Sequence, residues 1–197
     1  MYNGVLVKTY SAPSVDKREI LRYAGCRGEV DDATAALLEE CLLECLPVCV
    51  YRICYRLFDV KQNDGGLAIG NLQTNSVALR GNLEGCDKAV VFAATLGLDM
   101  DRLIAKYAGV KTAKALLFQA IGTERIEALC DVFCEDLQRE YAQVKQRFSA
   151  GYGDFSISAQ KEIFTMLDCS RQIGLTLNDS LLMSPTKSVT AIVGVKK

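Results

Sequence analysis

The sequence predicts an α+β fold in a single domain that spans residues 1–197. Apolar residues recur at helical spacing in some segments and alternate or form short runs in others, so helices and strands interleave. Asn63-Asp64-Gly65-Gly66 is a strong hairpin signal. Lys88–Thr95 (KAVVFAAT) is a compact apolar run typical of a buried central strand. A hairpin among interleaved helices favours an α+β architecture, and 197 residues can bury one sizeable core.

Residues 1–45 predict one short strand and two helices. Residues 5–10 fit a short edge strand, and residues 16–23 fit an amphipathic helix that begins at Asp16. One of the two Asp residues at 31–32 caps the next helix. Its apolar residues recur at helical spacing: Ala33, Leu37, Leu38, Cys41, Leu42 and Cys45.

A strand and a hairpin follow Pro47, which ends or kinks the preceding helix. Alternation predicts a strand over Val48–Phe58, and the hairpin turn lets Leu67–Leu72 pair back as a second strand. Asn75–Leu83 fits neither pattern clearly. One face of the first strand would carry Cys49, Tyr51, Ile53, Tyr55 and Leu57, with Cys54 on the other face.

The second half of the chain predicts three helices and a closing strand. Asp99 or Asp101 starts a helix after the central strand. Val110–Phe148 is the longest helical stretch and contains no Pro. Ser158–Gln172 predicts another helix, and Ser188–Val195 (SVTAIVGV) predicts the closing strand.

Composition excludes several classes of function. The net charge is −1 and no cluster of basic residues stands out, so we expect no nucleic-acid partner. The apolar runs are far shorter than a membrane-spanning helix, so we expect no membrane partner. The N-terminal residues lack the apolar core of a signal peptide, and we expect a cytoplasmic protein.

The chain contains nine Cys and no His, which limits its chemistry. Without His there is no imidazole base, no Ser-His or Cys-His pair and no Cys/His zinc site. An odd Cys count and the expected cytoplasmic location argue against a disulfide framework. Cys41, Cys45 and Cys49 could suggest a metal cluster, but Pro47 turns Cys49 away from the shared face. We therefore expect no metal site and interpret most Cys as small buried hydrophobes.

The segment Arg147–Asp154 (RFSAGYGD) interrupts the helical pattern with an Arg, two Gly and an aromatic residue. Gly permits a positive φ and close backbone approach, and the guanidinium fork fits a carboxylate. These features predict a loop around a small, flat, charged ligand. The alternative is an ordinary helix end with a Gly turn and a solvated Arg147.

Residues downstream of this loop complete a family pattern. RFSAGYGD is followed by Gln160, by a helix that ends in Arg171-Gln172-Ile173-Gly174, and by Met183-Ser184-Pro185-x-x-Ser188-Val189. In this order and spacing the chain resembles the activation (reactivation) domain of cobalamin-dependent methionine synthase. Ala93–Gly97 (AATLG), the helix around 124–131 and Leu21–Gly25 (LRYAG) are also similar. The resemblance covers most of the chain and implies a twisted, mainly antiparallel sheet flanked by helices.

The resemblance also implies a function. Domains of this family bind S-adenosylmethionine (SAM) and support reductive methylation of cob(II)alamin, with an electron from flavodoxin or a similar carrier. This chain has no His to ligate cobalt and no DxHxxG signature, so the cobalamin would belong to a separate methionine synthase or corrinoid protein. We therefore expect a stand-alone reactivation subunit for methionine biosynthesis, an accessory to a methyltransferase without catalytic residues of its own.

The family match assigns SAM-binding roles to particular residues. Arg147 would pair with the SAM carboxylate, and Tyr152 with the backbone of Ser149, Ala150 and Gly151 would hold the adenosine. Glu127 aligns with a family carboxylate near the SAM amino group. Asp16 aligns with an N-terminal family Asp across a short gap, and a helix cap is the alternative for it.

Geometry restricts the pairing of Glu127 with Arg147. Twenty helical residues would place them roughly 30 Å apart, too far for one ligand. The helix must therefore end by about position 143 and the chain must turn back. Apolar periodicity is lost after Leu137, which allows such an end. An exposed or helix-paired carboxylate is the alternative for Glu127.

Two departures from the family pattern affect the expected site. The family's Pro after the Arg is Phe148 here, and its Ala is Ser149. Family domains also continue past the position of Lys197 and supply a Tyr near SAM. We therefore expect that SAM binds more weakly than in the family domains, or that a partner protein completes the pocket. The alternatives are a SAM-independent docking or assembly module for a corrinoid methyltransferase and, less favoured, an independent SAM-using methyltransferase.

Overall fold

The computed structural model describes residues 4–63 and 66–196. Its main feature is a seven-stranded antiparallel sheet in the order β4-β3-β2-β5-β9-β6, with β1 also paired to β2. The long strands are β2 (Arg52–Asn63), β5 (Lys88–Thr95) and β9 (Ser188–Lys196). The short strands are β1 (Leu6–Thr9), β3 (Gly66–Ile69), β4 (Leu72–Thr74) and β6 (Gln143–Val144), and β7 (Thr176–Leu177) pairs with β8 (Met183–Ser184) in a separate sheet.

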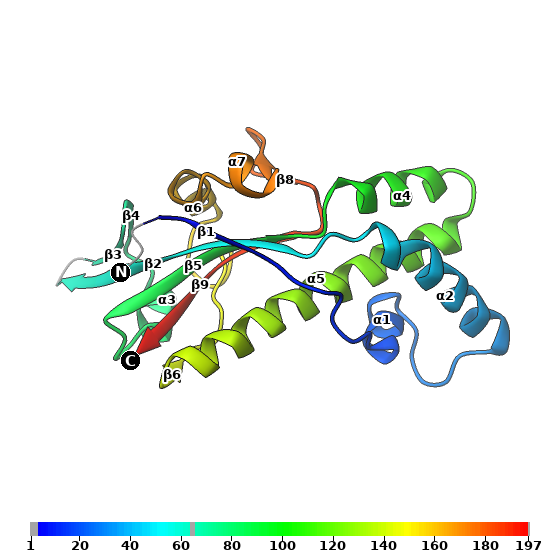
Figure 1. Cartoon of the computed structure of the whole chain (residues 1–197), viewed down its shortest axis with the longest axis horizontal. Coiled ribbons are helices and arrows are strands. Elements are labelled where there is room, and N and C mark those ends of the chain that lie inside the picture. Colours follow the sequence, from blue (N-terminus) through cyan, green and yellow to red (C-terminus); the bar gives the residue numbers. More distant parts are fainter. Residues whose placement is uncertain (1–3, 64–65, 197) are drawn as a thin grey trace.

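Helices cover both faces of the large sheet, so the predicted α+β class is confirmed. α5 (Thr112–Glu140) lies on one face, and α6 (Gln160–Leu167) and α7 (Cys169–Ile173) lie on the other (Figure 1). α3 (Val77–Asn82) packs into the same cluster as α6 and α7. The assignment of residues 1–197 to one domain stays a prediction.

Alternate residues of β2 enter opposite clusters, as the sequence predicts. Ile53 faces α5, together with Phe92 of β5, whereas Cys54 faces α6 and α7. Phe133 of α5 lies against this face, with its ring centroid 4.9 Å from Phe92 and 5.1 Å from Tyr55. Burial of these rings fixes the position of α5 on the sheet.

The N-terminal half of α5 extends beyond the sheet into a third cluster (Figure 1). It packs there against α1 (Lys17–Tyr23), α2 (Asp32–Cys45) and α4 (Leu98–Ala108). Ile20 and Phe118 are fully buried in this cluster. Asp16 and Asp31 cap α1 and α2 by accepting backbone N–H bonds, so both predicted N-caps are confirmed.

Most Cys are buried hydrophobes, as expected. Six of the nine are buried and all are free thiols. Pro47 lies in a short 3-10 helix, Leu46–Val48, but the chain returns so that Cys49 Sγ is 3.8 Å from Cys45 Sγ. The expectation that Cys49 turns away from Cys45 is therefore wrong. In the described residues no three His, Cys, Asp or Glu side chains are arranged to hold a metal ion.

Strand boundaries differ from the prediction around the hairpin. β2 begins at Arg52 instead of Val48 and runs to Asn63, because residues 46–48 form the 3-10 helix. Asn63 pairs with Gly66, while the turn residues Asp64 and Gly65 lie outside the described part of the chain. The predicted strand Leu67–Leu72 is two strands, β3 and β4, separated at Gly70, whose φ of 56° turns the chain.

Three helix boundaries also differ. α4 begins at Leu98 with Gly97 at the N-cap, so neither Asp99 nor Asp101 caps it. α5 ends at Glu140 instead of Phe148 because the following residues form β6 on the edge of the sheet. The predicted helix 158–172 breaks at Asp168, which adopts left-handed backbone (φ 48°), and Gly174 ends α7 as expected.

Candidate functional site

The end of α5 at Glu140 brings Arg147 back beside the middle of that helix. After β6, Lys145 N donates to Gly194 O and Phe148 forms a bridge to Ile192, so the chain follows β9. Arg147 Nη2 then lies 2.5 Å from Glu127 Oε2, although the two residues are 20 positions apart. The prediction that the helix ends by about position 143 and that the chain then turns back is confirmed.

The loop after Arg147 is held in a fixed turn. Gly151 has a φ of 96°, which favours Gly, and its N–H donates to Phe155 O (2.8 Å). Asp154 accepts bonds from Ser76 Oγ (2.5 Å) and from the first backbone N–H groups of α3, those of Val77 (2.7 Å) and Ala78 (3.1 Å). These bonds hold the pKa of Asp154 below its usual value.

A pocket of about 470 Å³ opens beside this loop, and we call it the loop pocket. Three parts of the fold contribute to it: α5, the loop with the start of α6, and the segment from β8 into β9. Phe148 and Tyr152 form an aromatic side, with ring centroids 6.3 Å apart. Its lining residues are Glu127, Arg147, Phe148, Ser149, Ala150, Tyr152, Gln160, Met183, Ser188, Val189 and Thr190.

A second pocket of about 470 Å³, the acidic pocket, shares Arg147 and Glu127 with the first. It is formed between α1, α5 and the segment before α1. Arg147 is the only basic side chain among its lining residues. Six of those lining residues are carboxylates: Asp16, Glu19, Glu124, Glu127, Asp131 and Glu135.

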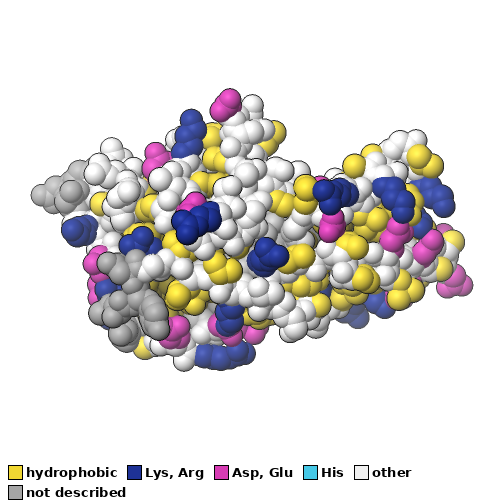
Figure 2. Space-filling model, turned by 45° about the horizontal axis from the view of Figure 1, so that its top comes forward, with side chains coloured by type: hydrophobic (Ala, Val, Ile, Leu, Met, Phe, Trp, Pro, Cys, Tyr) yellow, Lys and Arg dark blue, Asp and Glu magenta, His cyan; other side chains and the backbone are white. Residues whose placement is uncertain are grey.

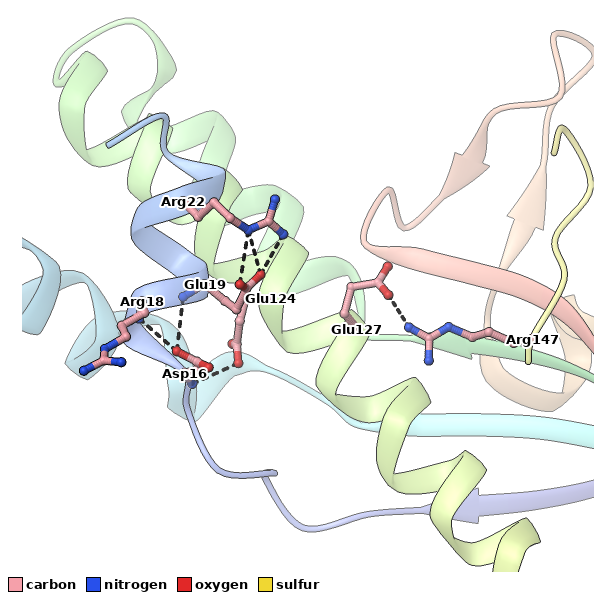
Figure 3. Close-up of polar contacts among 7 residues, drawn as sticks. All are labelled: Asp16, Arg18, Glu19, Arg22, Glu124, Glu127 and Arg147. Carbon is pink, nitrogen blue, oxygen red and sulfur yellow. Dashed lines mark hydrogen bonds and ion pairs between the residues drawn. The ribbon is translucent and has the colours of Figure 1, made fainter. Parts of the chain in front are cut away.

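The carboxylates near α1 are already engaged (Figure 3). Asp16 accepts from the N–H groups of Arg18 and Glu19, and Glu124 Oε1 accepts from the N–H of Asp16 (3.0 Å). Arg125, fully buried, donates to Glu124 Oε2 (2.5 Å) and to the backbone carbonyls of Pro13 and Ser14. This network fixes residues 13–16 against α5.

The predicted site residues therefore divide between two places. Arg147, Ser149, Ala150, Tyr152 and Glu127 line the loop pocket. Gly151 shapes the turn but is not a lining residue, and Asp16 lines the acidic pocket and caps α1. Gln160, Met183 and Ser188 also line the loop pocket, although in the sequence they belong only to the family pattern and carry no predicted binding role.

Arg147 makes two charged contacts, with Glu127 and with Asp131 Oδ1. Burial opposes its charge, but the bond to Asp131 and the neighbouring negative charges raise its pKa further above its usual range. Both carboxylates are partly exposed, 40% for Glu127 and 62% for Asp131. Arg147 itself is only 27% exposed, so its charge needs an anionic partner. A ligand carboxylate can take that role in place of Glu127 or Asp131.

The arrangement matches the charges of an α-amino acid. The Arg147 fork can bind a ligand carboxylate, while Glu127 or Asp131 can bind a ligand ammonium group.

The described residues contain no helix long and apolar enough to cross a membrane. On the face shown in Figure 2, basic and acidic side chains are scattered and form no single basic patch.

Comparison with known proteins supports the fold. No protein-family model matches the sequence, and no curated protein matches it. A solved structure described as the MetH reactivation domain bound to AdoHcy matches with a TM-score of 0.69 and 17% identity. The match covers 98% of this chain and 78% of that one. The chain therefore has the fold of the MetH reactivation domain.

Proposed function

We propose that the chain binds SAM in the loop pocket and serves as a reactivation subunit for a separate cobalamin-dependent methionine synthase in the cytoplasm. The observation that carries this proposal is the meeting of Arg147 and Glu127 beside the RFSAGYGD loop. The MetH reactivation domain of the same fold was crystallised with AdoHcy, the demethylated form of SAM, which supports the choice of ligand.

The loop pocket suits the two ends of SAM. At the amino-acid end, the SAM carboxylate would pair with Arg147 and the SAM ammonium group would pair with Glu127. The adenosine end would lie against Phe148 and Tyr152, near the backbone of Ser149 and Ala150. A volume of about 470 Å³ is within the usual range for small-molecule sites.

The chain's own residues bind and orient SAM, and the methyl-accepting cobalt belongs to a partner. With no His in the sequence, this chain has no imidazole to offer as the lower ligand of a corrinoid. A flavodoxin-like donor would supply the electron that reductive methylation requires, and AdoHcy would be left in the pocket. The expected partner is therefore a corrinoid-carrying methionine synthase.

Calorimetric titration tests the SAM site directly. SAM and AdoHcy are titrated into the protein, alone and with the corrinoid partner. Arg147→Ala should weaken binding by about 1.5–3 kcal/mol, the range for hydrogen bonds to charged groups. Arg139→Ala is the matched control, because Arg139 is on exposed α5 surface and lines neither pocket. An absence of binding under both conditions would refute the SAM assignment.

A second candidate is a SAM-independent docking or assembly module for a corrinoid methyltransferase. It is favoured by the fact that Arg147 already has two carboxylate partners. This candidate predicts that the protein captures a corrinoid protein equally well with and without SAM. Capture that depends on SAM would exclude it.

A further inference from the structure

Gln160 occupies an unusual position in the loop pocket. It is the first residue of α6 and follows the short 3-10 helix Ile157–Ala159. Its exposed fraction is only 5%, yet it lines the pocket. Gln is mostly a surface residue, so its burial at a pocket needs a physical reason.

The side-chain oxygen of Gln160 has no hydrogen-bond partner among the described residues. Buried polar atoms are almost always paired, because an unpaired one loses its bonds to water without replacement. The hydroxyl of Ser188, another lining residue, is paired with Thr95 Oγ1 (2.8 Å) and not with this oxygen. A donor carried by a ligand would remove this cost.

A carboxamide offers one acceptor and one donor group side by side. This pair is complementary to adenine, which presents an exocyclic amino group beside a ring nitrogen, and Gln pairs with adenine in this way in protein–DNA recognition. Phe148, Tyr152 and Met183 give the same pocket flat or apolar surface on which a purine can lie. Arg147, also a lining residue, is left for the carboxylate end of the ligand.

We propose that Gln160 determines the base specificity of this pocket, with its carboxamide oxygen accepting a hydrogen bond from the exocyclic amino group of adenine. This inference rests on the proposed function and deepens it. It gives a role to a buried oxygen that the fold itself leaves unpaired, and it assigns the adenine end of the ligand to the start of α6.

The test combines a protein variant with a ligand variant. AdoHcy is compared with an analogue in which hydrogen replaces the 6-amino group of the purine, using calorimetry. The wild-type protein should bind the analogue roughly tenfold more weakly, the effect of one lost hydrogen bond that leaves its partner buried. In Gln160→Met, which keeps length and removes the acceptor, the two ligands should bind about equally. Gln138→Met, an exposed site on α5, should behave as wild type.

Each result decides the inference. Equal binding of the two ligands by the wild-type protein refutes it, and so does an undiminished preference in Gln160→Met. The wild-type comparison stands alone if the variant does not fold. Binding of AdoHcy without a preference leaves the SAM site intact and removes only the role of Gln160. No binding of AdoHcy at all removes both.

Discussion

The loop pocket and the acidic pocket have the same volume, about 470 Å³, and share the Arg147–Glu127 pair, yet they differ in how far their polar groups are satisfied. In the acidic pocket Asp16 caps α1 and Glu124 is paired with Arg125. In the loop pocket the buried oxygen of Gln160 has no described partner. We interpret the satisfied groups as supports of the fold, and the unpaired oxygen of Gln160, which lines a pocket, as the proposed ligand contact.

The largest expected effect tests the structural role of the acidic pocket. Arg125→Met leaves Glu124 buried without its cation and releases the carbonyls of Pro13 and Ser14. Loss of one partner of a buried pair typically costs about 3–5 kcal/mol of unfolding free energy. Urea unfolding measures this, with Arg102→Met as an exposed control. A loss under about 1 kcal/mol would show that the network does not support the fold.

A smaller effect separates the two pockets functionally. Asp16→Ala removes the cap of α1 and should lower stability by about 1 kcal/mol. Because Asp16 lines only the acidic pocket, AdoHcy affinity should stay nearly unchanged. Thermal unfolding and calorimetry measure the two quantities. A tenfold loss of affinity with little loss of stability would restore Asp16 to the ligand site and break the distinction between the pockets.

The smallest effect concerns the support of the loop and depends on pH. Bonds from Ser76, Val77 and Ala78 lower the pKa of Asp154 in the folded state. Its contribution to stability is therefore fully present above the ordinary aspartate pKa of about 3.9 and is lost as the pH falls through the lower folded-state value. Asp154→Asn keeps one acceptor and removes the charge.

Unfolding curves between neutral and acidic pH check this expectation. The stability difference between wild type and Asp154→Asn should be greatest near neutral pH and should vanish in acid. A difference that does not change with pH would show that the charge of Asp154 has no role at α3. The loop would then be held by its own turn, in which the Gly151 N–H donates to Phe155 O.

Local signals in the sequence predicted the elements whose causes are local. The Asp residues before α1 and α2 cap their helices because a side chain satisfies nearby N–H groups. Lys88–Thr95 has the predicted bounds of β5, because a continuous apolar run suits a strand buried on both faces. Residues of β2 also lie on the predicted faces of the sheet, because successive side chains of a strand point to opposite sides.

Tertiary structure decided the features whose partners are distant in the chain. The loss of apolar periodicity after Leu137 allows a helix end but does not place it; α5 stops at Glu140 because Val144 pairs with Val195 of β9. Asp154 gains its role from the start of α3, where Ser76, Val77 and Ala78 lie 76 to 78 positions earlier in the chain. Gln160 becomes a pocket residue only because α6 packs on the sheet beside the loop.

The sequence by itself determined the α+β class, the caps of α1 and α2, the bounds of β5 and the residues that resemble a SAM-binding loop, because their signals lie in the local sequence. It also required the long helix to end by about position 143 if Arg147 and Glu127 were to meet. Only the tertiary structure placed Arg147 2.5 Å from Glu127, separated Asp16 from the loop pocket and buried Gln160 in it. These contacts depend on how the sheet and its covering helices pack, and local sequence carries no signal for that packing.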